Sequence, residues 1–253
     1  MFKALHARFI QKYRTNVFPD APPKLPDHFR GRPEFDAEKF DAELWKTAAD
    51  ACPVEAIDCN APSIDLGKCI FCGKCQRVNP AIEFGSEYRM GTMKKEQLIA
   101  DGSAYTLDEQ LDEGIKALYG KSLHIRQVSA GGCAACELDF NVLGTLAWDM
   151  GRFGIKVVAS PRHADALLVT GPVSFNMRTA LQKSYDAMGD PKLVIACGAC
   201  AISGGIYQNS EKAVGGVEKM LPVDLYVPGC PPHPATLLEA LVRFIGRRNK
   251  ANR

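Results

Sequence analysis

The sequence predicts an α/β protein, with a parallel β-sheet in its second half and a small cysteine-rich α+β module before it. From residue 122 onward, short β-prone runs alternate with helical stretches, the pattern of a parallel sheet covered by helices. The 253 residues leave room for one large domain or two modest ones. Ten cysteines stand in groups at short spacings, which indicates chemistry rather than incidental core packing.

Composition sets several classes of protein aside. The chain is 46% hydrophobic and 24% charged, which is ordinary for a globular protein. Its N-terminal segment lacks the pattern of a secretory signal, so we expect a reducing compartment, where clustered cysteines hold metal more often than they form disulfides. No apolar run approaches the roughly 18 residues that cross a bilayer. We therefore expect neither a disulfide scaffold nor a membrane-spanning chain.

The net charge of +2 conceals two basic ends. Residues 1–14 carry +4 and residues 241–253 carry +5, both without an acidic residue, which leaves the interior at −7. A nucleic-acid-binding protein usually has an extended basic face and a high pI, so we expect no nucleic-acid partner. The ends are interpreted either as solvated termini or as arms that lie against partner subunits or anionic lipid headgroups.

The chain divides into four predicted segments. Phe2, Leu5, Phe9 and Ile10 recur at helical spacing, and five prolines lie between positions 19 and 33, so residues 1–35 predict an amphipathic helix and an extended strap. A cysteine-rich module follows at 36–90, then a helical, charged linker at 91–121, then the α/β domain at 122–253.

The first cysteine group has the spacing of an iron–sulfur site. Cys69, Cys72 and Cys75 stand at two-residue gaps, so one loop can wrap three corners of a cubane. Cys52 is followed by proline, as is the remote fourth ligand of bacterial ferredoxins, whereas the other candidate, Cys59, is not. Zinc knuckles usually show two separated cysteine pairs instead. We predict a ferredoxin-like module in which these four cysteines (Cys52, Cys69, Cys72, Cys75) hold one [4Fe–4S] cluster.

A second cluster is missing from this module. A two-cluster ferredoxin would have another C-x-x-C-x-x-C ending near residue 48 and a Cys-Pro four residues after Cys75, where this chain has Asn79-Pro80. Residues 1–100 nevertheless resemble the polyferredoxin subunit of formate hydrogenlyase and its complex I relatives, on the basic helix, F-R-G-R-P and L-G-K-C-I-F-C-G-K-C. The departure from that family is the loss of one of its two clusters.

The second cysteine group is spread over three loops. Cys133 with Cys136, Cys197 with Cys200, and Cys230 follow predicted strands at 123–128, 192–196 and 223–227. Loops at the carboxyl ends of parallel strands converge on one edge of the sheet. Five thiols compete for four positions, and we favour Cys200 in its glycine-rich loop over Cys197, which closes an apolar strand. A zinc site and scattered core cysteines are the alternatives.

Residues 122–248 resemble the small subunit of membrane-bound, energy-converting [NiFe]-hydrogenases such as formate hydrogenlyase, and the related quinone-site cluster subunit of complex I. The likeness lies in S-P-R-H-A-D-A-L-L-V-T-G-P-V, G-A-C-A-I-S-G-G-I-Y and Y-V-P-G-C-P-P-H-P. It implies a flavodoxin-like fold that holds a second [4Fe–4S] cluster, with Cys133, Cys136, Cys200 and Cys230 as ligands.

Three further residues have two interpretations each. Glu137 either tunes the second cluster or moves protons beside it, or is an acid favoured by a helix N-terminus. Arg162 and His163 lie in a segment that resembles a family contact with the large subunit, and plain solvent exposure is the alternative.

The resemblance implies an electron-transfer subunit of a membrane-bound [NiFe]-hydrogenase-type complex. Two [4Fe–4S] clusters would pass electrons between an upstream donor, such as a ferredoxin or formate dehydrogenase module, and a catalytic site on a partner large subunit, with other hydrophilic and membrane subunits beside it. The chain would be peripheral, on the cytoplasmic side of the cell membrane, and would hold no catalytic residue. The alternatives are a cluster subunit of a complex I-like quinone oxidoreductase and a structural zinc-binding subunit.

Overall fold

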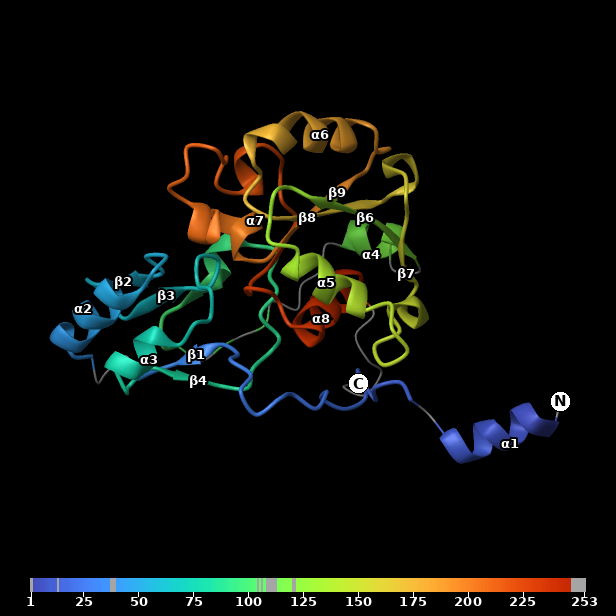
Figure 1. The fold of residues 1–253 in the computed structure, drawn as a ribbon, viewed down its shortest axis with the longest axis horizontal. Coiled ribbons are helices and arrows are strands. Elements are labelled where there is room, and N and C mark those ends of the chain that lie inside the picture. The colour runs from blue at the N-terminus through green and yellow to red at the C-terminus, as the bar shows by residue number, and fades with distance from the viewer. Residues whose placement is uncertain are drawn as a thin grey trace.

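The computed structural model describes residues 2–12, 14–36, 40–103, 105, 107, 113–119 and 122–246. A larger α/β body carries a smaller cysteine-rich module on one side, and helix α1 (Phe2–Gln11) extends away from both (Figure 1). The predicted helix at the N-terminus is therefore confirmed, and none of its described side chains is buried.

The larger body is built on a five-stranded sheet in which every neighbouring pair is parallel. Its spatial order is β10–β9–β8–β6–β7. Counted from the β7 edge, the strands stand second, first, third, fourth and fifth in chain order, the flavodoxin-like arrangement, so the predicted fold class is confirmed. The strands are β6 (Leu123–Ser129), β7 (Ile155–Val157), β8 (Ala166–Thr170), β9 (Leu193–Cys197) and β10 (Leu225–Val227).

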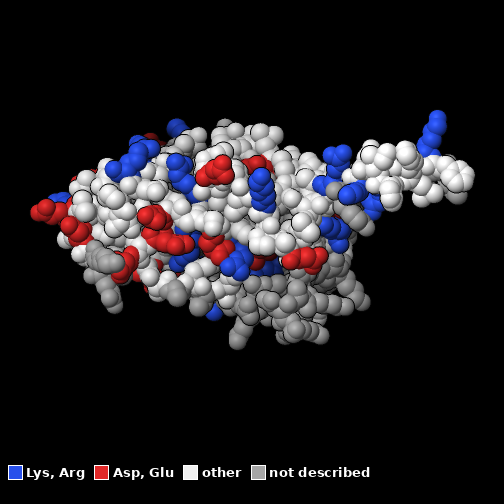
Figure 2. Space-filling view, turned by 90° about the horizontal axis from the view of Figure 1, so that it is seen from below, with Lys and Arg blue, Asp and Glu red and all other residues white. Residues whose placement is uncertain are grey.

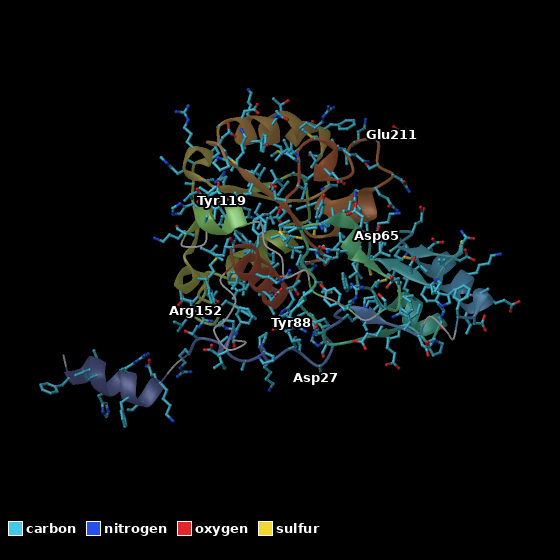
Figure 3. All side chains as sticks on the ribbon, turned by 180° about the vertical axis from the view of Figure 1, so that it is seen from behind. Asp27, Asp65, Tyr88, Tyr119, Arg152 and Glu211 are labelled. Carbon is cyan, nitrogen blue, oxygen red and sulfur yellow. The ribbon has the colours of Figure 1, made fainter. Side chains whose placement is uncertain are left out.

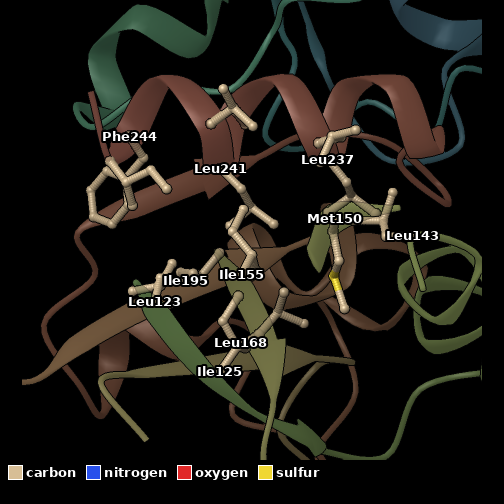
Figure 4. Packing of buried hydrophobic residues seen from close by; sticks show 14 of the residues in the cluster. Leu123, Ile125, Leu143, Met150, Ile155, Leu168, Ile195, Leu237, Leu241 and Phe244 are labelled. Atoms are coloured by element: carbon tan, nitrogen blue, oxygen red, sulfur yellow. The ribbon is translucent and has the colours of Figure 1, made fainter. Parts of the chain in front are cut away.

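Both faces of this sheet are buried, as expected for strands covered by helices on either side. In β8 the alternation is plain, since Leu168 belongs to one core and Leu167 to the other. Leu237 and Leu241 of α8 pack on the first face, as Figure 4 shows. Helices α5 (Ala135–Val142) and α8 (Pro234–Phe244) cover that face, and α6 (Phe175–Asp186) covers the other (Figure 1). The larger body also contains the short helices α4 (Glu113–Tyr119) and α7 (Ala199–Ser203).

The small module combines short helices with short antiparallel sheets. Helix α2 begins after Asp41, whose carboxylate accepts hydrogen bonds from the amides of Glu43 and Leu44. The elements are β1 (Pro33–Glu34), α2 (Ala42–Ala51), β2 (Ile57–Asp58), β3 (Ser63–Asp65), α3 (Lys74–Val78), β4 (Glu83–Phe84) and β5 (Ile99–Ala100), with β1 pairing β4 and β3 lying between β2 and β5.

The helix predicted across 91–121 differs from the observed structure. Among the described residues an α-helix forms only at Glu113–Tyr119, while Lys95–Leu98 form a 3-10 turn that leads into β5. Strand β5 pairs with β3, and Leu98 and Ala100 are buried. The chain here alternates buried and exposed side chains, so residues 95–100 complete the small module instead of linking it to the next.

The two parts share one core. Trp45 and Ile64 of the small module belong to the same buried cluster as Leu167 and Val194 of the sheet. Thr92 exchanges two backbone hydrogen bonds, of 2.9 and 2.8 Å, with Tyr226 in β10. The cysteine-bearing loops of the two parts are thus held in fixed positions relative to one another.

Residues 14–32 form the predicted strap, which has no helix or strand. The Arg152 guanidinium donates to the carbonyls of Asn16 and Phe18 at one end (Figure 3). Farther along, Arg30 donates to the Phe71 carbonyl at 3.4 Å. The strap therefore crosses from the α/β domain to the loop of the first cysteine group.

Candidate metal centres

The first predicted thiol set comes together. Cys52 ends α2, Cys69 and Cys72 lie in the loop before α3, and Cys75 lies within α3. All four line one cavity, whose remaining walls are largely apolar. Cys59 is exposed and does not line it.

These four thiols influence one another electrostatically. Burial raises the pKa of the Cys69 thiol, and the nearby charges of Cys75, Cys52 and Cys72 raise it further. Backbone amides point at two of the sulfurs, since Phe71 donates to Cys69 Sγ and Ala56 to Cys52 Sγ, each at 3.3 Å. Amides aimed at sulfur stabilise thiolates, and a bound cation offsets the repulsion that crowded thiolates otherwise suffer. The site fits an iron–sulfur group by both criteria.

The second predicted set lies at the carboxyl edge of the large sheet. Cys133 follows β6 and Cys136 lies in the first turn of α5. Cys200 lies in α7 after β9, and Cys230 follows β10. The parallel strands therefore bring together loops that are far apart in sequence, as the pattern predicted.

The thiols of this second set are also electrostatically coupled. Burial is the main cause that raises the pKa of Cys200 to about 12, and the charges of Cys230, Cys136 and Cys133 add to it. Cys133 and Cys230 are exposed, while Cys136 and Cys200 are half-buried. Four soft thiol donors within electrostatic range of one another suit an iron–sulfur group, and the exposed pair leaves one side of the site open.

The fifth thiol, Cys197, is fully buried at the end of β9, as expected for a core cysteine. Sequence reasoning missed that Cys197 lies within electrostatic range of Cys136. The neighbouring Cys136, together with burial, raises the pKa of the Cys197 thiol, and Cys197 in turn lowers the pKa of Cys136. Next to it, a Cβ on Gly198 would lie 2.7 Å from Cys136 Sγ, so only glycine allows this close approach.

Glu137 is fixed by two hydroxyl groups. Ser129 Oγ and Thr170 Oγ1 each donate to its Oε1 at 2.6 Å. Burial opposes ionisation, yet these hydrogen bonds lower the pKa of Glu137 below its usual value. The carboxylate is thus held, ionised, directly after Cys136, in the first turn of α5, where the helix dipole favours negative charge.

Arg162 and His163 lie apart from both thiol sets. They belong to the turn Pro161–His163 that precedes β8 and are exposed. This turn approaches the edge where β8 begins, whereas the cysteines follow the edge where the strands end. Any role of this pair is therefore remote from the thiols.

A groove joins the two sites. It has a volume of about 320 Å³ and is lined by Ile70 and Phe71 of the first cysteine loop and by Cys230 and His233 of the second. The charge of Cys72 contributes to the raised pKa of Cys230, after burial, Cys136 and Cys133. His233 accepts a hydrogen bond from the Ala235 amide through Nδ1 and caps α8, a role that the sequence did not suggest.

The position of the missing cluster is filled by side chains. The ferredoxin spacing counted back from Cys52 places ligands at residues 42, 45 and 48, and counted forward from Cys75 at residue 79. Ala42, Trp45, Ala48 and Asn79 stand there, and all of them except Ala42 are buried. The Trp45 ring lies 4.9 Å from that of Phe35 and 5.9 Å from that of Phe40. Aromatic packing takes the place of a metal group at this end of the module.

Two kinds of feature do not occur among the described residues. In these ranges, no three Cys, His, Asp or Glu side chains converge as they would on a single metal ion. Nor is any helix of the described chain long and apolar enough to cross a bilayer.

Comparison with known proteins identifies relatives of the second half. Residues 133–244 match the family described as NADH ubiquinone oxidoreductase, 20 Kd subunit. An uncharacterized protein of Methanocaldococcus jannaschii, MJ0516, is 42% identical over 130 residues, which cover 51% of this chain and 87% of that protein. Formate hydrogenlyase subunit 7 of Escherichia coli is 42% identical over 56% of each chain. An NADH-quinone oxidoreductase subunit of Bacteroides fragilis is 50% identical over 44% of this chain and 57% of its own length.

The chain thus spans little more than half the length of the latter two relatives. A solved structure of an archaeal membrane-bound sulfane sulfur reductase is similar over 56% of this chain and 84% of the chain in that structure. The sequence identity is 31% and the TM-score is 0.44. The predicted resemblance to the small subunit of [NiFe]-hydrogenases and complex I is confirmed by the family and sequence matches. Residues 133–244 of the chain belong to the family of the 20 kDa subunit of NADH ubiquinone oxidoreductase.

Proposed function

We propose that this protein is an electron-transfer subunit of a membrane-bound, [NiFe]-hydrogenase-type complex and carries two [4Fe–4S] clusters. The first would be held by Cys52, Cys69, Cys72 and Cys75, and the second by Cys133, Cys136, Cys200 and Cys230. The observation that carries the proposal is the convergence of eight thiols into two adjoining sets. When bound, such clusters accept and release single electrons.

The chain's own residues would hold and insulate these groups. Apolar walls around the first set exclude water, which helps to set the potential of a bound cluster. The groove lined by Phe71 and Cys230 places the two sets side by side. A fusion of the ferredoxin-like module at 36–90 with the domain at 122–253 turns an encounter between two proteins into a fixed intramolecular step.

The partners follow from the open side of the second set. The exposed thiols Cys133 and Cys230 would be covered by a catalytic large subunit, to or from which electrons pass. An upstream donor, such as a ferredoxin or a formate dehydrogenase module, would serve the first cluster, and membrane subunits would complete the complex. Formate hydrogenlyase subunit 7 favours the hydrogenase-type partner. The similarity to an NADH-quinone oxidoreductase favours the second candidate, a complex I-like quinone reductase.

Metal analysis tests the proposal. The anaerobically prepared chain is expected to contain about eight iron atoms and as much acid-labile sulfide, from two four-iron clusters. A measured content of about four iron atoms per chain would mean that the chain holds only one cluster. Zinc in place of iron would refute the redox function. Nickel in the intact purified complex would distinguish the hydrogenase-type partner from the quinone-reducing one.

We further propose that the protein lies against the cytoplasmic face of the cell membrane and that α1 contacts anionic lipid. Phe2, Leu5 and Phe9 lie along one side of α1 and are 85%, 59% and 83% exposed. Lys3 and Arg8 flank them, and the projecting arm carries basic but no acidic side chains (Figure 2). A basic helix with an aromatic face suits the membrane interface.

Removal of residues 2–11 is expected to lower binding of the full chain to phosphatidylglycerol vesicles at least tenfold, because each basic residue near an anionic surface contributes about 1 kcal/mol. Co-sedimentation measures this, with phosphatidylcholine vesicles as the uncharged control. A Phe2→Ser, Phe9→Ser variant keeps every charge and is expected to bind at an intermediate level. Equal binding by the truncated and complete chains would assign α1 to a protein partner instead.

A further inference from the structure

Helix α8 carries a buried ion pair that neither thiol set uses. Glu239 and Arg243, one helical turn apart, are each 6% exposed. Arg243 Nε donates to Glu239 Oε1 at 2.8 Å, and Arg243 Nη2 donates to Glu239 Oε2 at 3.3 Å. A buried ion pair gains little stability over apolar side chains of similar size, because the cost of removing both charges from water offsets their attraction. This pair therefore calls for an explanation other than stability.

The ion pair is bonded to a segment that comes from the small module. Residues 85–93, the crossing segment, lead from β4 to the α/β domain before the chain returns to the module at β5. Arg243 Nη2 also donates to the carbonyl of Gly91 in this segment. A Cβ on Gly91 would lie 2.4 Å from the Cβ of Ala240, so a larger residue would push the segment away from α8.

The residues on either side of Gly91 contact the sheet and the groove. Thr92 exchanges backbone hydrogen bonds of 2.9 and 2.8 Å with Tyr226 in the edge strand β10. Met90 is 4% exposed and lines the groove between the two thiol sets, as does Cys230. The bonded carbonyl thus lies between a residue that pairs with the sheet and a residue that separates the two sites.

We propose that Arg243 is a positioning residue which, with Glu239 as its counterion, clamps the crossing segment onto α8 and so fixes the distance between the two proposed clusters. The planar guanidinium can bond the Glu239 carboxylate and the Gly91 carbonyl at once. Buried polar groups are costly to leave without partners, so the pair selects the one docking of the small module in which all of them are bonded. The effect on the clusters rests on the proposed function, whereas the clamp itself does not.

A double substitution separates clamping from stability. Glu239→Met with Arg243→Met replaces the ion pair by apolar side chains of similar size and leaves no buried charge without a partner. Lys95→Ala is the matched control, because it removes an ion pair with Glu218 that joins the same two parts of the chain but is exposed. The anaerobically prepared full chain is compared in all three forms by denaturant unfolding, by hydrogen exchange with mass spectrometry, and by EPR.

Hydrogen exchange tests the clamp. In the double variant, peptides from residues 85–93 are expected to exchange at least tenfold faster than in wild type, equivalent to about 1.4 kcal/mol, because the segment leaves α8 more often. The midpoint of unfolding should stay near wild type, and Lys95→Ala should match wild type in both measurements. Exchange at the wild-type rate in the double variant would overturn the clamp. A lower midpoint with equally faster exchange along the whole chain would make the pair merely stabilising and overturn it too.

EPR tests the effect on the clusters. When both proposed clusters are reduced, their unpaired electrons should interact across the groove, and such an interaction weakens steeply with distance. We expect one well-defined splitting in wild type and in Lys95→Ala, and a weaker or broadened one in the double variant. The same splitting in all three forms would overturn the positioning role. A wild-type chain without either cluster signal would refute the proposed function, and the exchange measurement would still decide the clamp.

Discussion

Replacing Cys52 is expected to remove the first cluster alone, lowering the iron content from about eight to about four atoms per chain. Cys52 lines the same cavity as Cys69, Cys72 and Cys75, and the Ala56 amide already points at its sulfur. The second thiol set belongs to a different body, so its cluster should persist. Cys52→Ser is expected to abolish the ferredoxin-type EPR signal. Cys52→Ala, which offers no oxygen ligand, is expected to do the same.

Cys59→Ser is the matched control. Cys59 is exposed and does not line the cavity, so its replacement should leave the iron content and both signals as in wild type. The opposite pattern, with Cys52→Ala retaining the signal and Cys59→Ser losing it, would assign the fourth thiolate to Cys59. Loss of both signals in Cys52→Ala would show that the two clusters assemble only together.

Trp45→Ala is expected to lower the free energy of unfolding by about 3–5 kcal/mol, the usual cost of deleting a large buried aromatic side chain. Trp45 is 2% exposed and packs against Phe35 and Phe40. Its loss would open a void where a two-cluster ferredoxin holds metal. Denaturant unfolding under anaerobic conditions, followed by circular dichroism, measures the change as a lower midpoint at an unchanged slope.

Trp45→Phe, which keeps a ring in the cavity, should lose much less stability than Trp45→Ala. Leu44→Ala on the exposed side of the same helix controls for helix propensity and should cost little. A loss of less than about 1 kcal/mol in Trp45→Ala would mean that the surrounding side chains collapse into the void. The aromatic cluster would then not be what replaces the second metal group.

The parts of the fold that the sequence predicted are those with strong local patterns. The strand predicted at 192–196 is observed at Leu193–Cys197, a continuous apolar run of the kind that is typical of a buried strand between helices. The helix at the N-terminus was predicted from the helical spacing of its apolar residues. The prediction of a helix at 95–100 was wrong because the charged composition of this segment resembles that of an exposed helix. Its pairing with β3 is a contact between residues that are distant in sequence.

The candidate sites divide in the same way. Spacing alone grouped Cys69, Cys72 and Cys75, because residues three apart share one loop whatever the rest of the chain does. The same pattern indicated that one cluster site had been lost, but not that Trp45 fills it. The proximity of Cys197 to Cys136 places the end of one strand beside the helix that follows another, and no local pattern encodes it.

The sequence by itself predicted the two thiol sets, the alternation of strands and helices along the second half, and a resemblance to an oxidoreductase subunit family. Cysteine spacing and hydrophobic periodicity are properties of neighbouring residues and are readable along the chain. Only the tertiary structure decided that the sets adjoin across one groove, that Cys72 lies within electrostatic range of Cys230, and that Cys197 lies within electrostatic range of Cys136. Those relations arise where separate loops meet, and burial and packing, rather than local pattern, fix them.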